Sequence, residues 1–310
     1  MSGIVRRLLL TLPTVLGVAT LVFFFVHLLP GDPVDVMLGE TASAADRAGL
    51  RAALGLDRPL GQQYLEFVRH TATGDLGRSL RDGSSVARRI GDCLPATLLL
   101  TATAGAVALL VAVPLGALAA RHRGCWLDTA ATAFSLIGAS LPNFFLGPLL
   151  VLLFAVRLEW FPVSGADSPA ALALPATTLG LGMSSLLTRL VRAAVLDTLG
   201  TDYVRTARAK GLSEPAVFLR HALRSALLPV TTVFGLQLSG LLGGAIVTET
   251  IFAWPGIGRL TLQAINGRDY PMLQGCVLVI ACGCVAINFL TDLVYQRLDP
   301  RVRIEARGAR

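Results

Sequence analysis

The sequence predicts an all-α integral membrane protein with six transmembrane helices. Hydrophobic residues make up 54% of the 310-residue chain and charged residues only 15%, whereas soluble domains usually carry about 25% charged residues. The apolar residues also gather in long runs without charge, and a helix needs about 20 such residues to cross the hydrocarbon core of a bilayer. We therefore expect much of the surface to face lipid.

The first charge-free run extends over residues 8–29 and follows Arg6 and Arg7. It ends at Leu29-Pro30-Gly31-Asp32-Pro33, a sequence that stops helices. The run is longer than the apolar part of a signal peptide, and no small-residue cleavage site follows it. We expect an uncleaved first span over 8–29.

Five further runs of the same kind complete a single transmembrane domain over residues 1–310. Prolines lie inside or at the ends of these runs, where membrane helices tolerate them and often bend. The fifth run is rich in small residues that allow close helix packing; a static packing face and a moving interface explain them equally well. The five runs are 94–120, 129–156, 168–188, 225–248 and 271–291, and the small residues are Gly235, Ser239, Gly240, Gly243 and Gly244.

The distribution of Arg and Lys predicts the orientation, because short cytoplasmic loops of membrane proteins carry most of the cations. Placing both termini in the cytoplasm puts most cations of the short connections on that side. The long loop 30–93 then lies outside, where the rule does not apply to loops of its length. We expect a multi-pass protein of the cytoplasmic membrane.

The inner loop 196–228 has a helical sequence pattern of its own. A short helix over Asp202–Lys210 is predicted to end at Gly211, and a second helix to begin after Ser213 with Pro215 in its first turn. The loop is therefore predicted to be helix, tight glycine turn, helix.

The chain lacks the motifs of the common membrane-associated enzymes. Its single lysine, Lys210, lies between Ala209 and Gly211 and not in a P-loop, so ATP hydrolysis must reside on another chain. It has neither a His-Glu-x-x-His nor a Gly-x-Ser-x-Gly sequence, and its histidines and cysteines match no metal-binding spacing. We expect no enzyme activity and no cofactor or metal, and a membrane enzyme is the weakest hypothesis.

A stand-alone secondary transporter is the alternative to an ATP-driven one. Ion-coupled transporters usually place ionisable residues deep within their spans. No predicted span has an acid or Arg near its centre, since Glu249 and Asp292 lie at span edges. This pattern argues against the alternative without excluding it, because backbone carbonyls can also bind ions.

Seven sequence blocks carry a resemblance to a known family. The segment Tyr203–Leu212, with Leu227-Leu228-Pro229 after it, resembles the cytoplasmic EAA loop of binding-protein-dependent ABC importers, in the form found in dipeptide, oligopeptide and nickel permeases. Arg205 and Thr206 stand where the general EAA pattern has Glu and Ala. The other six blocks follow the family's order along nearly the whole chain: Leu28–Pro33, Gly74–Ser79, Trp160–Gly165, Glu249–Gly258, Arg268–Pro271 and Leu298–Arg301.

This resemblance implies the type I ABC importer permease fold and a transport function. The chain would be a permease subunit that moves peptides or a related small solute, such as a nickel chelate or a glutathione-like compound. Its implied partners are a second homologous permease in a heterodimer, two ATPase subunits that use the ATP, and an extracytoplasmic solute-binding protein. No nucleic acid is implied.

The resemblance also singles out candidate site residues. The ATPase-coupling candidates are Tyr203, Arg205, Ala207, Arg208, Lys210, Gly211 and Leu212. Small alanines would let the first helix enter a groove, and the cations would meet acids on the ATPase or, alternatively, anionic lipid headgroups.

A second set of candidates is implied near the outer gate and the docked binding protein. For the two tryptophans of this set, an aromatic belt at the membrane surface is the simpler interpretation. The set is Trp160, Pro162, Glu249, Trp254, Pro255 and Gly256.

Overall fold

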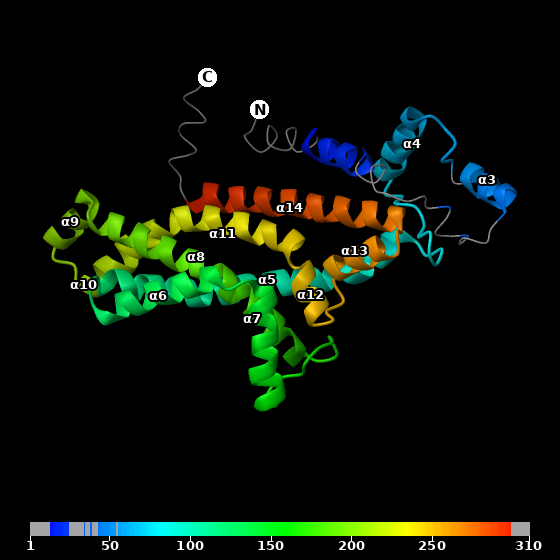
Figure 1. Ribbon diagram of the computed structural model, residues 1–310. Coiled ribbons are helices and arrows are strands. Elements are labelled where there is room, and N and C mark those ends of the chain that lie inside the picture. Colours follow the sequence, from blue (N-terminus) through cyan, green and yellow to red (C-terminus); the bar gives the residue numbers. More distant parts are fainter. Residues whose placement is uncertain (1–12, 25–33, 35–37, 39–42, 54, 299–310) are drawn as a thin grey trace, which may run out of the picture. The chain divides into compact units, whose positions relative to one another are not determined.

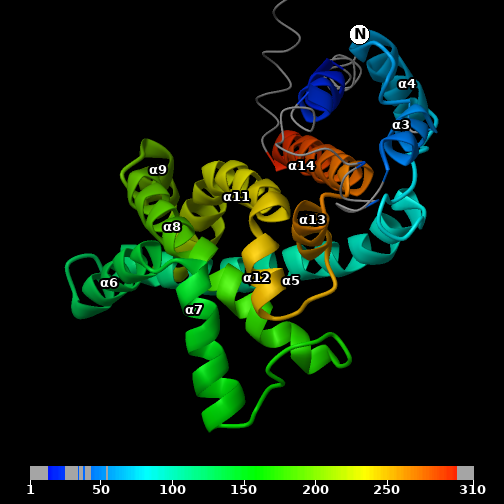
Figure 2. The same cartoon turned by 45° about the vertical axis from the view of Figure 1, so that its right-hand side comes forward.

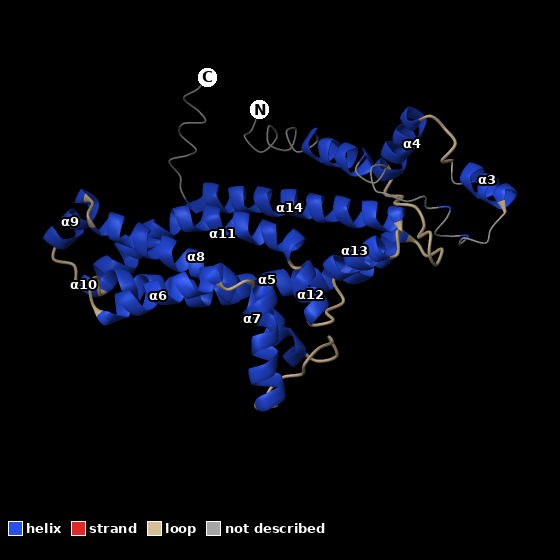
Figure 3. Cartoon of the chain, viewed as in Figure 1, coloured by secondary structure: helices blue, strands red, loops and turns tan. Residues whose placement is uncertain are grey.

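The computed structural model describes residues 13–24, 34, 38, 43–53 and 55–298 (Figure 1). Helices make up most of this part of the chain, and no strand forms within it (Figure 3). The chain divides into two compact units, Met1–Thr97 with Pro255–Val285 and Leu98–Trp254 with Ala286–Arg310. The prediction of an all-α protein is confirmed for the described residues.

Within the described residues, four helices are long and apolar enough to cross a membrane: Val86–Arg121, Pro169–Leu199, Glu214–Gly244 and Tyr270–Tyr295. A bent pair, Trp126–Ser140 and Asn143–Arg157, makes a fifth span if its two helices are counted together. The shorter apolar helix Pro13–Phe24 lies within the predicted span 8–29, and the rest of that span falls outside the described residues.

The first unit is built around the first parts of two long helices. It contains α3 (Ala44–Ala53), α4 (Leu60–Ala72), the start of α5 (Val86–Arg121), α13 (Ile257–Asn266) and the start of α14 (Tyr270–Leu298). Apolar residues of α5, α13 and α14 form its core, which comprises Val86, Ile90, Ile257, Leu260, Ala264, Met272, Leu273 and Cys276.

The second unit is organised around α8 (Ala173–Leu199), which packs against its neighbours on several sides. These neighbours include α6 (Trp126–Ser140), α7 (Asn143–Leu150) and α11 (Arg224–Gly244). Glycines allow the closest approaches, since an added Cβ at Gly116 would lie 2.7 Å from the Thr188 carbonyl oxygen. The unit also contains the π-helical turns η1 (Val151–Arg157) and η3 (Val217–Leu223), the 3₁₀ turn η2 (Pro169–Leu172), and the short helices α9 (Asp202–Ala209), α10 (Glu214–Ala216) and α12 (Ile246–Ile251).

Residues 129–156, predicted as one span, form two helices with an angle of 106° between them. The break lies at Leu141 and Pro142. Proline has no N–H to donate, and it disfavours the α conformation in the residue before it. Leu141 is accordingly extended (φ −87°, ψ 114°), and Pro142 begins a new helix, α7.

Helix ends differ from the predicted span ends where charged turns continue a helix. The span predicted over 168–188 belongs to a helix that runs to Leu199, and the span predicted to begin at 225 belongs to a continuous rod, Glu214–Gly244. The helix α5 begins at Val86, within the predicted outer loop 30–93. Hydropathy marks the part of a helix that suits lipid, not the place where its hydrogen bonds end.

The small residues of α11 serve different purposes. An added Cβ at Gly235 would lie 2.2 Å from the side chain of Thr291, so this glycine lets α11 and α14 touch. Ser239 is buried, whereas Gly240 and Gly244 have nothing within 4 Å of the Cβ position. Gly235 therefore belongs to a packing face between α11 and α14. That the other glycines form a moving interface stays a prediction.

Candidate functional site

The candidate coupling residues lie in a hairpin of residues 200–223 that joins α8 to α11. The short helix α9 lies at the end of α8 (Figure 2). The returning arm is formed by α10 and η3. Gly211 makes the reversal with a φ of +78° and donates its N–H to the Arg208 carbonyl at 2.9 Å. The prediction that Gly211 ends the first helix is confirmed, because this left-handed conformation favours glycine.

A small apolar core holds the two arms of the 200–223 hairpin together. Val204 and Ala207 of α9 pack against Val217 of η3, with Leu199 at the edge of the cluster. Ala207 is only 5% exposed. The prediction that Ala207 offers a small docking face is therefore wrong: this alanine lets the arms of the hairpin approach each other, and Ala209 is the exposed alanine of the pair.

Ion pairs within the hairpin engage two of the three candidate cations. Arg208 donates Nε–H to Glu214 Oε1 at 2.8 Å, and Arg205 contacts Asp202 at 3.2 Å. Both pairs are largely exposed, and pairs of this kind stabilise a protein by only about 0–1 kcal/mol. They nevertheless reduce the positive charge that the hairpin presents, and Lys210 is exposed at its tip.

The exposed face of the hairpin also carries large apolar side chains. Tyr203 and Leu212, both predicted as coupling residues, are exposed. Leu219, which was not among the predicted site residues, is exposed as well, next to the buried Val217 and Phe218. The Tyr203 hydroxyl forms a 2.6 Å hydrogen bond with His221 Nδ1, which fixes the tyrosine on the returning arm. The face therefore combines apolar side chains with paired charges.

The predicted outer candidates do not form one surface. Trp160 and Pro162 are exposed, whereas Glu249 and Trp254 are buried. Pro255 and Gly256 belong to the other compact unit. The aromatic-belt interpretation fits the exposed Trp160, which packs beside Phe154 with 5.8 Å between ring centroids, but not the buried Trp254.

The two motifs that supply all six of these candidates, Trp160–Gly165 and Glu249–Gly258, contact each other through residues that the sequence analysis did not select. Phe252 is 1% exposed and packs in a cluster with Leu150 and Leu174 and with the partly buried Phe161. Its carbonyl accepts the Gly165 N–H at 2.9 Å. The signal available in the sequence was weak, since Phe252 is one apolar residue among several.

Two further motifs of the resemblance meet in the first unit. The Ser79 hydroxyl donates to Asp269 Oδ2 at 2.5 Å, and the Leu80 N–H donates to Oδ1 at 3.1 Å. Asp269 is 5% exposed and also accepts the Met272 N–H at 3.4 Å, which caps the start of α14. One carboxylate thus fixes the 75–85 turn to α14.

The 75–85 turn holds two more carboxylates by local donors. The Ser84 hydroxyl and N–H lower the pKa of Asp82 to about 2, and the Gly77 N–H lowers the pKa of Asp75. Both carboxylates are therefore ionised at neutral pH, as acceptors within the turn require.

Replacing Asp269 with alanine should loosen this turn. The change leaves the buried Ser79 hydroxyl and Leu80 N–H without their acceptor, which costs about 1–3 kcal/mol. We expect faster cleavage within 74–85 in limited proteolysis and a lower thermal unfolding temperature in detergent. Asp92→Ala, at an exposed carboxylate of α5 outside the turn, is the control; equal cleavage rates in both variants would contradict this account.

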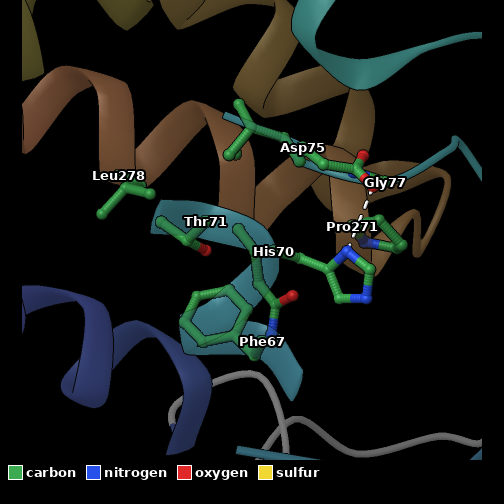
Figure 4. A pocket seen from close by; sticks show the side chains of 10 residues that line it. Phe67, His70, Thr71, Asp75, Gly77, Pro271 and Leu278 are labelled. Carbon is green, nitrogen blue, oxygen red and sulfur yellow. Dashed lines mark hydrogen bonds and ion pairs between the residues drawn. The ribbon is translucent and has the colours of Figure 1, made fainter. Parts of the chain in front are cut away.

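A cavity of about 250 Å³ lies beside the turn, between α4 and the start of α14. Its walls are mainly apolar, with Phe67, Pro271 and Leu278 among them, and a hydrogen bond of 3.1 Å between His70 Nδ1 and Asp75 Oδ2 lies at its edge (Figure 4). None of the candidate residues lines it. Within the described residues, no group of three or more His, Cys, Asp or Glu is arranged to hold a metal ion.

Comparison with known proteins places the chain in a family. Residues 112–304 match the family of binding-protein-dependent transport system inner membrane components, and residues 1–101 match the N-terminal region of such components. The glutathione transport system permease protein of Salmonella typhimurium is 43% identical over 98% of this chain and 99% of its own length. The dipeptide transport system permease protein of Escherichia coli K12 is 42% identical over 97% and 98%.

Solved structures show the same fold at lower identity. The inward-facing MetNI methionine ABC transporter matches with a TM-score of 0.59 and 18% identity, over 68% of this chain and 96% of the matched chain. An amino acid ABC transporter with histidines matches with a TM-score of 0.54 and 15% identity, over 68% and 94%. The 200–223 hairpin, its supporting helices and these matches agree: the chain belongs to the family of inner membrane components of binding-protein-dependent transport systems, the permease subunits of ABC importers.

Proposed function

We propose that this permease translocates peptides or a related small solute, such as a glutathione-like compound or a nickel chelate. The proposal is supported by the relatives, which are named as glutathione and dipeptide permeases and match almost end to end. The permease would pair with a second, homologous permease and receive solute from a binding protein. Two ATPase subunits would bind and hydrolyse the ATP, because Lys210 is not part of a P-loop.

The observation that carries the coupling part of the proposal is the 200–223 hairpin itself. One arm, α9, follows the end of the long helix α8 after only Gly200 and Thr201, and the other continues into α11 as the rod Glu214–Gly244. Force on the hairpin would therefore reach two spans directly. A π-helical turn, η3, lies in the returning arm, and such turns are frequent at functional sites.

We infer that the exposed face of the hairpin docks on the ATPase. Tyr203, Leu212 and Lys210 present side chains there, and Gly211 makes the turn that displays them. Arg205 and Arg208 contribute to docking through their guanidinium groups, which remain exposed although each is paired with an acid of the hairpin. Ala207 packs inside the hairpin and holds its arms together. Closure of the ATPases would push this face and drive alternating access.

The orientation follows from the docking. With the hairpin in the cytoplasm, both termini lie on the same side and the segment 30–93 lies outside. The exposed Trp160 and Pro162 would then face the outer water or the membrane surface, near the docked binding protein, while Glu249 and Trp254 would support that region from buried positions.

A vesicle experiment tests the proposal against the secondary-transporter alternative. Purified permeases, ATPases and binding protein are reconstituted, and uptake of a labelled dipeptide or of glutathione is followed with ATP or with a proton or sodium gradient. We expect uptake only with ATP and binding protein. Uptake by this chain alone, driven by an ion gradient, would support the alternative.

A further inference from the structure

The short connection between α5 and α6 contacts α8 shortly before the 200–223 hairpin and the returning arm of the hairpin itself. Arg121 is the last residue of α5, and Asp128 lies in the first turn of α6. Their partners, Arg192 and Phe218, lie on α8 and on η3. We call these four residues the 121–128 clasp.

The first contact of the clasp is a bidentate ion pair. Arg192 donates Nε–H to Asp128 Oδ1 at 2.5 Å and a terminal N–H to Oδ2 at 2.8 Å. The Gly124 N–H donates to Oδ2 at 3.0 Å, so the connection itself is fixed to the same carboxylate. Asp128 is 7% exposed, unlike the acids of the hairpin pairs. Two parallel hydrogen bonds hold α6 to α8 in a defined geometry.

The second contact of the clasp reaches the returning arm. The Arg121 guanidinium lies over the Phe218 ring, with its central carbon 5.9 Å from the ring centroid. Phe218 is buried and belongs to the π-helical turn. A cation over an aromatic face is attracted by the negative face of the ring, and the attraction is stronger where water is excluded.

The positions of these partners set what the clasp can do. Arg192 lies about two turns before the end of α8 at Leu199, and Phe218 lies just over one turn after the start of α10 at Glu214. A displacement that moves the returning arm of the hairpin and the end of α8 therefore pulls on the connection between α5 and α6. The chain itself joins the hairpin only to α8 and α11. The clasp adds contacts that connect it to α5 and α6.

We propose that the 121–128 clasp transmits motion of the 200–223 hairpin to α5 and α6, so that Asp128 and Arg192 are positioning residues for coupling. This inference rests on the proposed docking of the ATPase at the hairpin. A buried ion pair is weak support for stability, because its desolvation offsets much of its attraction. What the pair supplies is a fixed geometry between two helices.

The test compares solute uptake per ATP hydrolysed in reconstituted vesicles. Asp128→Asn keeps one oxygen acceptor but loses the charge and one of the two parallel bonds, and Arg192→Gln removes the other partner. We expect the rate of ATP hydrolysis to stay within about twofold of the wild type. We expect uptake per ATP to fall by about fivefold, which is the lower end of the fold-changes that correspond to typical coupling free energies. Asp128→Glu, which keeps a bidentate carboxylate, should recover most of the ratio. The matched control is Arg58→Gln, which breaks the exposed Arg58–Glu66 ion pair outside the hairpin.

Two results would overturn the clasp. The first is an unchanged uptake per ATP in Asp128→Asn and Arg192→Gln; the second is a fall in uptake that only follows the loss of folded protein, with Asp128→Glu giving no recovery. Failure of the proposed function looks different, because the wild type and Arg58→Gln would then also lack ATP-dependent uptake.

Discussion

Replacing Gly211 with proline should abolish solute uptake while the ATPases continue to hydrolyse ATP. Gly211 has a φ of +78°, whereas proline holds φ near −65°. The change also removes the N–H that Gly211 donates to the Arg208 carbonyl. Residues with a Cβ already lose about 1–2 kcal/mol in the left-handed conformation, and proline cannot adopt it. The tip of the hairpin must therefore take another path and displace Lys210 and Leu212.

The expected magnitude is at least about a tenfold loss of uptake, which corresponds to about 1.4 kcal/mol. Gly211→Ala should give an intermediate loss. Gly200→Ala is the matched control, because Gly200 has a φ of −80° and the nearest neighbour of an added Cβ lies 3.5 Å away. Membrane insertion, followed by the yield of detergent-soluble protein, should be normal in all three variants. Normal uptake in Gly211→Pro would contradict a coupling role for this turn.

Replacing Gly116 with leucine should prevent correct assembly of the second unit. An added Cβ would lie 2.7 Å from the Thr188 carbonyl oxygen and from the Val191 Cβ. Overpacking usually costs about 1–3 kcal/mol, and here one neighbour is a backbone oxygen that a rotamer change cannot move. Gly180 makes a similar approach from α8 to α5, because an added Cβ there would lie 2.8 Å from the Ala104 carbonyl oxygen. The crossing of the two helices therefore depends on a glycine in each of them.

The fraction of monodisperse protein and the thermal unfolding temperature in detergent measure this effect. We expect Gly116→Leu and Gly180→Leu to lower both strongly, with Gly116→Ala in between. Gly240→Leu is the control, since nothing lies within 4 Å of its Cβ position. If Gly116→Leu behaved like the control, the described crossing of α5 and α8 would be wrong.

The positions of the apolar helices could be predicted because absence of charge over about 20 residues is a local property. Their ends could not, because α5 begins with the charged turn after Val86 and α8 continues through Arg189 and Arg192. The proline at 142 indicated a possible bend, but the 106° angle depends on the packing of α7 against α8 and α12.

Part of the candidate site was also readable from the sequence. Gly211 was predicted correctly because a helix that must reverse sharply needs glycine at its end. Ala207 was misassigned, although its spacing of three from Val204 places both residues on one face of a helix, away from Arg205. The clasp and the Phe252 cluster join residues far apart in the chain, and no local pattern predicts such contacts.

The most direct test of the central claim is a pull-down of the tagged chain in gentle detergent, with mass spectrometry of the proteins recovered. The account predicts P-loop ATPase subunits and a second, homologous permease in the wild-type sample, with less ATPase bound to Gly211→Pro. Recovery of the wild-type chain alone, stable and able to move solute in vesicles without ATP, would contradict it.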